Sequence, residues 1–174
     1  MNETTLKTYQ MSFAGSLLKR GFWLYVWKIK SRDRLVLYVG RTGDSSSSNA
    51  ASPFNRIGQH LDFRQNARGN AMARQLKRAG IDPRDCDFEM LALGPVFEEQ
   101  KTMALHKPYR DRMSALEKAT ATFLKNQKYN VLGVHHSSVV VDPEIWVQVE
   151  NVLKVHFPRC PGAREIKHLS ENKQ

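Results

Sequence analysis

One run of residues restricts the fold of this chain more than any other. Residues 22–29 read Phe-Trp-Leu-Tyr-Val-Trp-Lys-Ile, and such a run of aromatic and β-branched residues is typical of a β-strand. A polar stretch at 30–34 follows it, and residues 35–39 form a second apolar run. Two strands joined by a short polar segment predict a β-hairpin.

The register of this hairpin decides which side chains meet. If the hairpin closes around Ser31 and Arg32, Tyr25 lies directly opposite Tyr38 on one face. Two neighbouring phenols beside Gly40 and a basic loop exceed what core packing needs, although aromatic strand residues usually belong to a core. From these residues alone, the two tyrosines could belong either to the hydrophobic core or to a functional site.

The signals that follow the hairpin predict helices and a further strand. Ser52 and Pro53 form a helix start, with serine as N-cap and proline at the first helical position. Gly69 separates this helix from a second one at about 70–79. The later elements are a strand at 87–93 closed by Gly94-Pro95, a long helix after Pro108 with Met113, Leu116, Thr120, Phe123 and Leu124 as its buried stripe, and a last helix that begins at Asp142-Pro143.

This order of elements indicates an α/β fold. We expect a small central antiparallel sheet of three strands, made of the N-terminal hairpin and the later strand and flanked by helices. A length of 174 residues fits one domain. We place that domain at residues 21–156, with a polar lead-in at 1–20 and a loose tail at 157–174 that contains two prolines.

The cysteines and the early apolar residues bear on location. Cys86 and Cys160 have no metal-site or redox-motif spacing, so we expect no disulfide-linked partner and a reducing, cytoplasmic environment. The first ten residues do not form a leader segment, and the apolar run at 21–27 is too short to cross a bilayer. We therefore expect no membrane partner.

The distribution of charge points to a polyanionic partner. The formal net charge is +10, and the first 80 residues carry all of this excess while residues 81–174 balance to zero. A one-sided excess of this kind is typical of a face that meets nucleic acid, although solubility alone would also explain a basic chain. The residues expected to contact the nucleic-acid backbone are Arg64, Arg68, Arg74, Lys77 and Arg78.

Six motif elements in order give the chain a family resemblance. They are Tyr25 in WLYVWKI, Tyr38 in YVGRT, Arg56 and His60 in SPFNRIGQHL, Glu117 in SALEKATATFL and Asn130 in KYNVLG. In this order and spacing, over residues 21–133, the chain resembles the GIY-YIG nuclease superfamily. Trp23-Leu24-Tyr25 replaces the Gly-Ile-Tyr of the first motif but keeps its tyrosine, and the segments 41–52 and 81–108 are longer than in the shortest members.

The resemblance implies a metal-dependent DNA endonuclease with a GIY-YIG-like fold. It implies Tyr25 as the general base, Arg56 as a clamp on the phosphate and Glu117 as the ligand of Mg²⁺ or Mn²⁺. Tyr38 then orients water or phosphate, and His60 transfers a proton or hydrogen-bonds Tyr25. Gly40 and Asn130 have supporting roles, and Arg41 and Thr42 are expected to contact nucleic acid.

The residue types suit this chemistry on physical grounds as well. Phosphodiester hydrolysis needs an activated water and charge neutralisation at the phosphoryl oxygens. Mg²⁺ keeps most of its waters and needs only one or two carboxylates. A tyrosine has an ordinary pKa near 10, so we expect Arg41, Arg56 and the metal to help it ionise. Taken singly, Glu117, Arg56 and His60 would also fit solvated surface positions.

Two other functions stay open from the sequence. The chain could be a DNA- or RNA-binding module on a nuclease-like scaffold that does not cleave, or a structural partner in a larger nuclease complex. No second DNA-binding motif is visible in the sequence. Sequence specificity would therefore come from the two long segments or from a homodimer.

Overall fold

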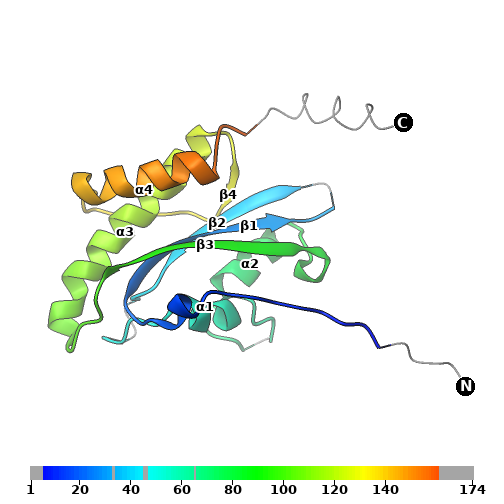
Figure 1. The fold of residues 1–174 in the computed structure, drawn as a ribbon, viewed down its shortest axis with the longest axis horizontal. Coiled ribbons are helices and arrows are strands. Elements are labelled where there is room, and N and C mark those ends of the chain that lie inside the picture. Colours follow the sequence, from blue (N-terminus) through cyan, green and yellow to red (C-terminus); the bar gives the residue numbers. More distant parts are fainter. Residues whose placement is uncertain (1–5, 33, 45–46, 65, 161–174) are drawn as a thin grey trace, which may run out of the picture.

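The computed structural model of this chain describes residues 6–32, 34–44, 47–64 and 66–160. It is an α/β fold in which helices cover both faces of a four-stranded sheet (Figure 1). The strands are β1 (Phe22–Lys30), β2 (Leu35–Arg41), β3 (Asp87–Phe97) and β4 (Asn130–Leu132). The helices are α1 (Pro53–His60), α2 (Ala71–Arg78), α3 (Met103–Asn126) and α4 (Pro143–His156), with short 3₁₀ turns at Gly15–Leu18 and Pro83–Asp85.

β1 is buried on both of its faces, which explains why its sequence shows no polar alternation. The strand order is β3-β1-β2-β4, so β1 lies inside the sheet. Leu24 and Val26 point into the core under α3 and α4, whereas Tyr25 and Trp27 point into the core under α1 and α2. Because successive side chains of a strand point to opposite faces, a strand between two helical layers is apolar throughout.

The helices begin where the sequence predicts, with one exception. The Ser52 hydroxyl accepts a hydrogen bond from the Asn55 N–H and caps α1, and the Asp142 carboxylate caps α4 in the same way. The predicted stripe of α3 is buried against the sheet. However, α3 begins at Met103 and not after Pro108, because Thr102 caps its N-terminus. Pro108 has no N–H to donate to the carbonyl of Ala104, but Ala104 is exposed and water can bind that carbonyl.

The predicted hairpin register is wrong by two residues. Lys30 pairs with Leu35 at the end of the hairpin, Tyr25 pairs with Gly40, and Tyr38 pairs with Trp27. A shift of two keeps every side chain on its face, so both tyrosines still face α1 and α2. They are diagonal neighbours and not a directly opposed pair.

The predicted three-stranded antiparallel sheet is also wrong. β4 adds a fourth strand, which pairs in parallel with Val36–Tyr38 of β2 and makes the sheet mixed. β3 does not end at Gly94-Pro95 but continues to Phe97 across an irregularity in its pairing with β1. β3 is an edge strand, where a proline without an N–H is tolerated.

The C-terminal boundary lies later than predicted. Phe157 is fully buried in the core, the Cys160 N–H donates to the Gln127 carbonyl, and the Tyr129 hydroxyl donates to the Pro158 carbonyl. Residues 157–160 therefore belong to the domain, and the rest of the predicted tail, like residues 1–5 of the lead-in, lies outside the described residues. In the described ranges no helix has the length and apolarity to span a membrane, and Cys86 and Cys160 are both free thiols.

Candidate active site

The short β4 leaves one end of β2 open at the sheet edge. β4 stops at Leu132, opposite Tyr38, so within the described part of the chain Val39–Arg41 have no strand on their outer side. Side chains from both faces of the sheet approach each other around this end of β2. Most of the residues predicted from the motifs gather here.

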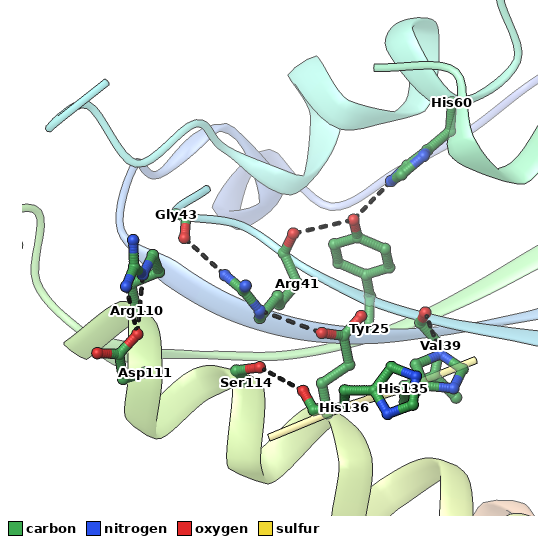
Figure 2. A network of polar contacts seen from close by, with 11 residues as sticks. Tyr25, Val39, Arg41, Gly43, His60, Arg110, Asp111, Ser114, His135 and His136 are labelled. Carbon is green, nitrogen blue, oxygen red and sulfur yellow. Dashed lines mark hydrogen bonds and ion pairs between the residues drawn. The ribbon is translucent and has the colours of Figure 1, made fainter. Parts of the chain in front are cut away.

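Tyr25 and His60 form the centre of this site on the α1 face. The Tyr25 hydroxyl lies 2.6 Å from His60 Nε2 and 3.1 Å from the Arg41 carbonyl oxygen. Figure 2 shows the phenol oxygen between these two groups. His60 Nδ1 is buried without a partner among the described residues. Only a hydrogen on Nε2 gives every donor an acceptor: His60 donates to the phenol oxygen, and the phenol donates to the carbonyl.

Gly40 allows Tyr25 to reach this position. The Tyr25 ring lies across the backbone of Gly40, where a Cβ would come within 2.4 Å of the ring carbon Cε2 and 2.8 Å of the hydroxyl oxygen. No side chain fits in that space. The supporting role predicted for Gly40 therefore has a steric basis.

Replacing Gly40 by alanine should displace the Tyr25 ring. We expect Gly40→Ala to lower the free energy of unfolding by about 1–3 kcal/mol, the usual range for an overpacked core, in urea unfolding. Gly58→Ala is the matched control, because Gly58 lies in α1 with no heavy atom within 4 Å of its Cβ position. That variant should gain about 0.5–1 kcal/mol from helix propensity. Equal effects of the two substitutions would contradict the steric role.

Arg41 and Glu117 meet on the opposite face of the sheet. Arg41 Nε donates to Glu117 Oε2 at 3.1 Å, and Arg41 Nη1 donates to the Gly43 carbonyl at 2.7 Å. Both side chains are about one-fifth exposed. Because neighbouring strand residues point to opposite faces, Arg41 turns towards α3 while Gly40 leaves room for Tyr25. Arg41, predicted to contact nucleic acid, thus holds a carboxylate in the site.

Arg56 supplies the positive charge on the Tyr25 side. Its guanidinium donates to Gln59 Oε1 at 2.6 Å and lies 3.7 Å from an Asp44 carboxylate oxygen. Its Nε is buried and has no hydrogen-bond partner among the described residues. The charge of Arg56 acts on Tyr25, His60 and Glu117 alike, since it lowers the pKa of each.

Burial dominates the titration of the two tyrosines. It raises the pKa of Tyr25 to about 12, against the opposing charges of Arg56 and Arg41. Burial, together with the neighbouring Tyr25 and Glu117, also raises the pKa of Tyr38 above its ordinary value. Arg41 and Arg56 act in the predicted direction, but desolvation of a phenol that is 1% exposed outweighs them. Both phenols are neutral at pH 7.

His60 is held neutral by the same environment. Burial, and secondarily the charge of Arg56, lowers the pKa of His60 to about 3. Its ring makes edge contacts with both Tyr25 and Tyr38, with centroids 5.6 and 5.3 Å apart. An imidazole enclosed in this way has no room for the water that would solvate an imidazolium.

The buried His60 should make the fold sensitive to acid. Its pKa is lower in the folded than in the unfolded chain, so below pH 6.5 the unfolded chain binds the proton first and stability falls as the pH drops towards 3. We expect a loss of up to about 1.4 kcal/mol per pH unit in urea unfolding between pH 6.5 and 4.5. This slope should be smaller in His60→Gln and unchanged in His156→Gln, at an exposed position of α4. Equal slopes in all three proteins would contradict the assignment.

Two predicted residues do not join the site. Asn130 pairs with Val36 at the far end of β2 from Arg41, and it is exposed. Thr42 is 1% exposed, and its hydroxyl donates to the Gly21 carbonyl and accepts from the Trp23 N–H. The nucleic-acid contact predicted for Thr42 is wrong, because its side chain is used within the fold. The basic residues predicted for backbone contact are all exposed: Arg64, Arg68, Arg74, Lys77 and Arg78.

His135 is a neighbour of the site that the sequence did not indicate. Its Nε2 lies 3.3 Å from the Val39 carbonyl oxygen, at the open end of β2 (Figure 2). Burial lowers the pKa of His135, so the imidazole donates to this carbonyl in its neutral form. No spacing or motif links residues 39 and 135, so only the folded chain reveals this contact.

Glu117 is the residue that could hold a divalent cation. Among the described residues no three His, Cys, Asp or Glu side chains form a metal cage. Mg²⁺ does not need one, since it is commonly bound by one or two carboxylates together with water and phosphate oxygens. Glu117 Oε1 has no hydrogen-bond or ion-pair partner in the described part of the chain, and burial raises the pKa of the carboxyl above its ordinary value. A partly desolvated carboxylate with one oxygen unengaged fits such an ion.

The chain was compared with known protein families, curated proteins and solved structures. No protein-family model, no curated protein and no solved structure matches the chain. The chemical arguments therefore rest on the residues themselves.

Proposed function

We propose that this protein is a divalent-metal-dependent endonuclease of the GIY-YIG type that hydrolyses phosphodiester bonds in DNA. The observation that carries the proposal is the hydrogen-bonded Tyr25–His60 pair beside Arg56, with the Arg41–Glu117 pair across the same open strand end. A proton-transfer group, a cation for the phosphate and a carboxylate for a metal are the three groups that this reaction needs.

Tyr25 acts as the general base in its phenolate form. The phenolate accepts a hydrogen bond from His60 Nε2, which holds the oxygen in place, and it takes a proton from the attacking water. Because the pKa of Tyr25 in the free protein is about 12, the base forms only when positive charge is added nearby. A divalent cation held by Glu117 would supply that positive charge, whereas the phosphate of the substrate would not.

Arg56 holds the scissile phosphate. Its guanidinium presents a planar fork of donors that matches two phosphate oxygens, and its Nε now lacks an acceptor among the described residues. The phosphate replaces Gln59 and Asp44 as its partner. Tyr38, next to His60, lines the same side of the site.

Glu117 would hold Mg²⁺ or Mn²⁺ through its unengaged oxygen. The ion supplies charge neutralisation at the phosphoryl oxygens and lowers the pKa of nearby water. Arg41 keeps the carboxylate oriented by its bond to the other oxygen. Waters and phosphate oxygens would complete the coordination of the ion, so one carboxylate would be enough.

The alternative is a nucleic-acid-binding module that does not cleave. The neutral, buried Tyr25 favours it, because a general base must reach the proton that it removes. So does the Arg41–Glu117 ion pair, which already neutralises the carboxylate. Under this alternative the exposed basic residues bind DNA or RNA and the polar cluster serves the fold.

Incubation of the purified protein with supercoiled plasmid separates the two functions. With Mg²⁺ we expect nicked and linear DNA, and with EDTA we expect none. Binding of the same DNA in EDTA, measured by mobility shift, provides the control for an intact surface. Binding without cleavage in Mg²⁺ or Mn²⁺ would establish the module and overturn the endonuclease.

A further inference from the structure

A groove lined by α2 and by the segments before and after it combines basic and apolar side chains. It has a volume of about 800 Å³ and lies between the loop that follows α1, helix α2 and the 3₁₀ turn at 83–85. These elements are on the α1 and α2 side of the sheet (Figure 1). The lining residues used below are Phe63, Arg64, Arg74, Lys77, Ile81 and Arg84.

The charge of the groove is positive, and part of it is uncompensated. Arg64 and Arg84 each bind an aspartate two residues earlier in the chain, Asp62 and Asp82. Arg74 and Lys77 have no ion pair among the described residues. They lie three positions apart on α2, so both side chains project from the same side of that helix. The groove therefore offers two cations to an anionic ligand.

Phe63 gives the groove an exposed aromatic ring. The side chain is 53% exposed, although phenylalanine is one of the residue types most often buried. Ala67, Ala73 and Pro83 continue the apolar lining beside it. An exposed aromatic ring can stack on a flat ring of a ligand, and the neighbouring cations can bind its negative charge. The groove therefore suits a ligand that has both features.

The groove and the Tyr25–His60 pair lie on the same side of the sheet, that of α1 and α2. Arg74 lines the groove, and the charge of Arg74 acts on Tyr38, the ring that contacts His60. Phe63 follows His60 by three residues in the chain. A strand whose phosphate lies at Arg56 would have to run along this face to place its neighbouring nucleotides in the groove.

We propose that this groove binds unpaired nucleotides of a nucleic-acid strand, with a base stacked on Phe63 and the backbone phosphates on Arg74 and Lys77. This inference deepens the proposed function, since it names the part of the substrate that lies next to the scissile bond. A blunt duplex fits poorly, because its internal bases are stacked on both faces and only the two terminal pairs present a free face to Phe63. An acidic peptide would meet the cations but leave the ring without a partner.

Fluorescence anisotropy with a labelled single strand of twenty thymidines, in EDTA, tests the groove. Stacking of one base on an aromatic side chain corresponds to roughly a five- to 150-fold change in affinity. We therefore expect Phe63→Ala to weaken binding of this strand at least fivefold and to change binding of a blunt 20-base-pair duplex less than twofold. Phe63→Tyr should keep the affinity, because it keeps the ring. Val155→Ala, at an exposed apolar position of α4, is the control variant.

Two results would contradict the proposal that the groove binds unpaired nucleotides. One is equal binding of the single strand by Phe63→Ala and the unmodified protein. The other is displacement of the strand by polyglutamate of equal charge at equal concentration, which would mean that the surface recognises charge alone. Plasmid cleavage in Mg²⁺ is measured on the same proteins. Cleavage without Phe63-dependent binding would contradict only the nucleotide-binding role of the groove. Phe63-dependent binding without cleavage would contradict only the endonuclease function.

Discussion

Glu117→Gln should reduce plasmid cleavage by a factor of at least about 10³, which corresponds to several kcal/mol of the reaction barrier. The substitution keeps the shape of the side chain but removes the negative charge that would hold the metal. An amide oxygen can still accept the hydrogen bond from Arg41 Nε, and the buried stripe of α3 is unchanged. We therefore expect an intact fold. Binding of DNA in EDTA should persist or tighten, since a negative charge has left the site.

The matched control for this variant is Glu150→Gln. Glu150 is a carboxylate of α4 that pairs with Lys154 on the surface, so its loss tests for a general effect of charge. Cleavage by this control should equal that of the unmodified protein. If Glu117→Gln nicks plasmid at the unmodified rate, Glu117 does not hold the metal and the site assignment fails.

Tyr25→Phe should reduce cleavage by about 10²–10⁴, the usual contribution of a general base. It also leaves His60 Nε2 and the Arg41 carbonyl without their buried partner, so we expect a loss of about 1–3 kcal/mol in the free energy of unfolding. The activity must therefore be measured at a temperature where the variant is folded, as judged by circular dichroism. Glu117 is untouched, so binding of Mn²⁺ followed by calorimetry should be retained.

Tyr129→Phe provides the corresponding control. It removes a hydroxyl that donates to the Pro158 carbonyl near the end of the domain, away from the open edge of β2. Both its stability and its cleavage should stay close to those of the unmodified protein. A Tyr25→Phe protein that cleaves normally would leave the phenol with a purely structural role.

The sequence predicts best those helices and strands that are determined by residues close to one another in the chain. The apolar run of β1, the Ser52 cap of α1 and the stripe of α3 each depend on residues close in the chain, and each lies where it was predicted. The hairpin register does not depend on local residues alone. Tyr25 needs the space above Gly40, and the register in which Lys30 pairs with Leu35 gives it this space.

The contacts that complete the site are beyond any local pattern. Arg41 and Glu117 are 76 residues apart, and β4 has only three residues, too few for a strand signal. The pKa of Tyr25 depends on a burial that no motif reveals, so the prediction from the nearby positive charges did not include the desolvation that outweighs Arg41 and Arg56. The residue types of the site were thus predictable, whereas their pairing and charge states were not.

The early end of β4 has a consequence for how copies of this chain behave together. A sheet edge with unsatisfied backbone groups can recruit a strand from another molecule, and this recruitment is a route to aggregation. Here the carbonyl groups of Val39 and Arg41 are taken by two side chains, His135 and Tyr25. At the other edge, Pro95 interrupts the regular pairing of β3. These contacts reduce the number of backbone acceptors that a strand from another molecule could pair with at this edge.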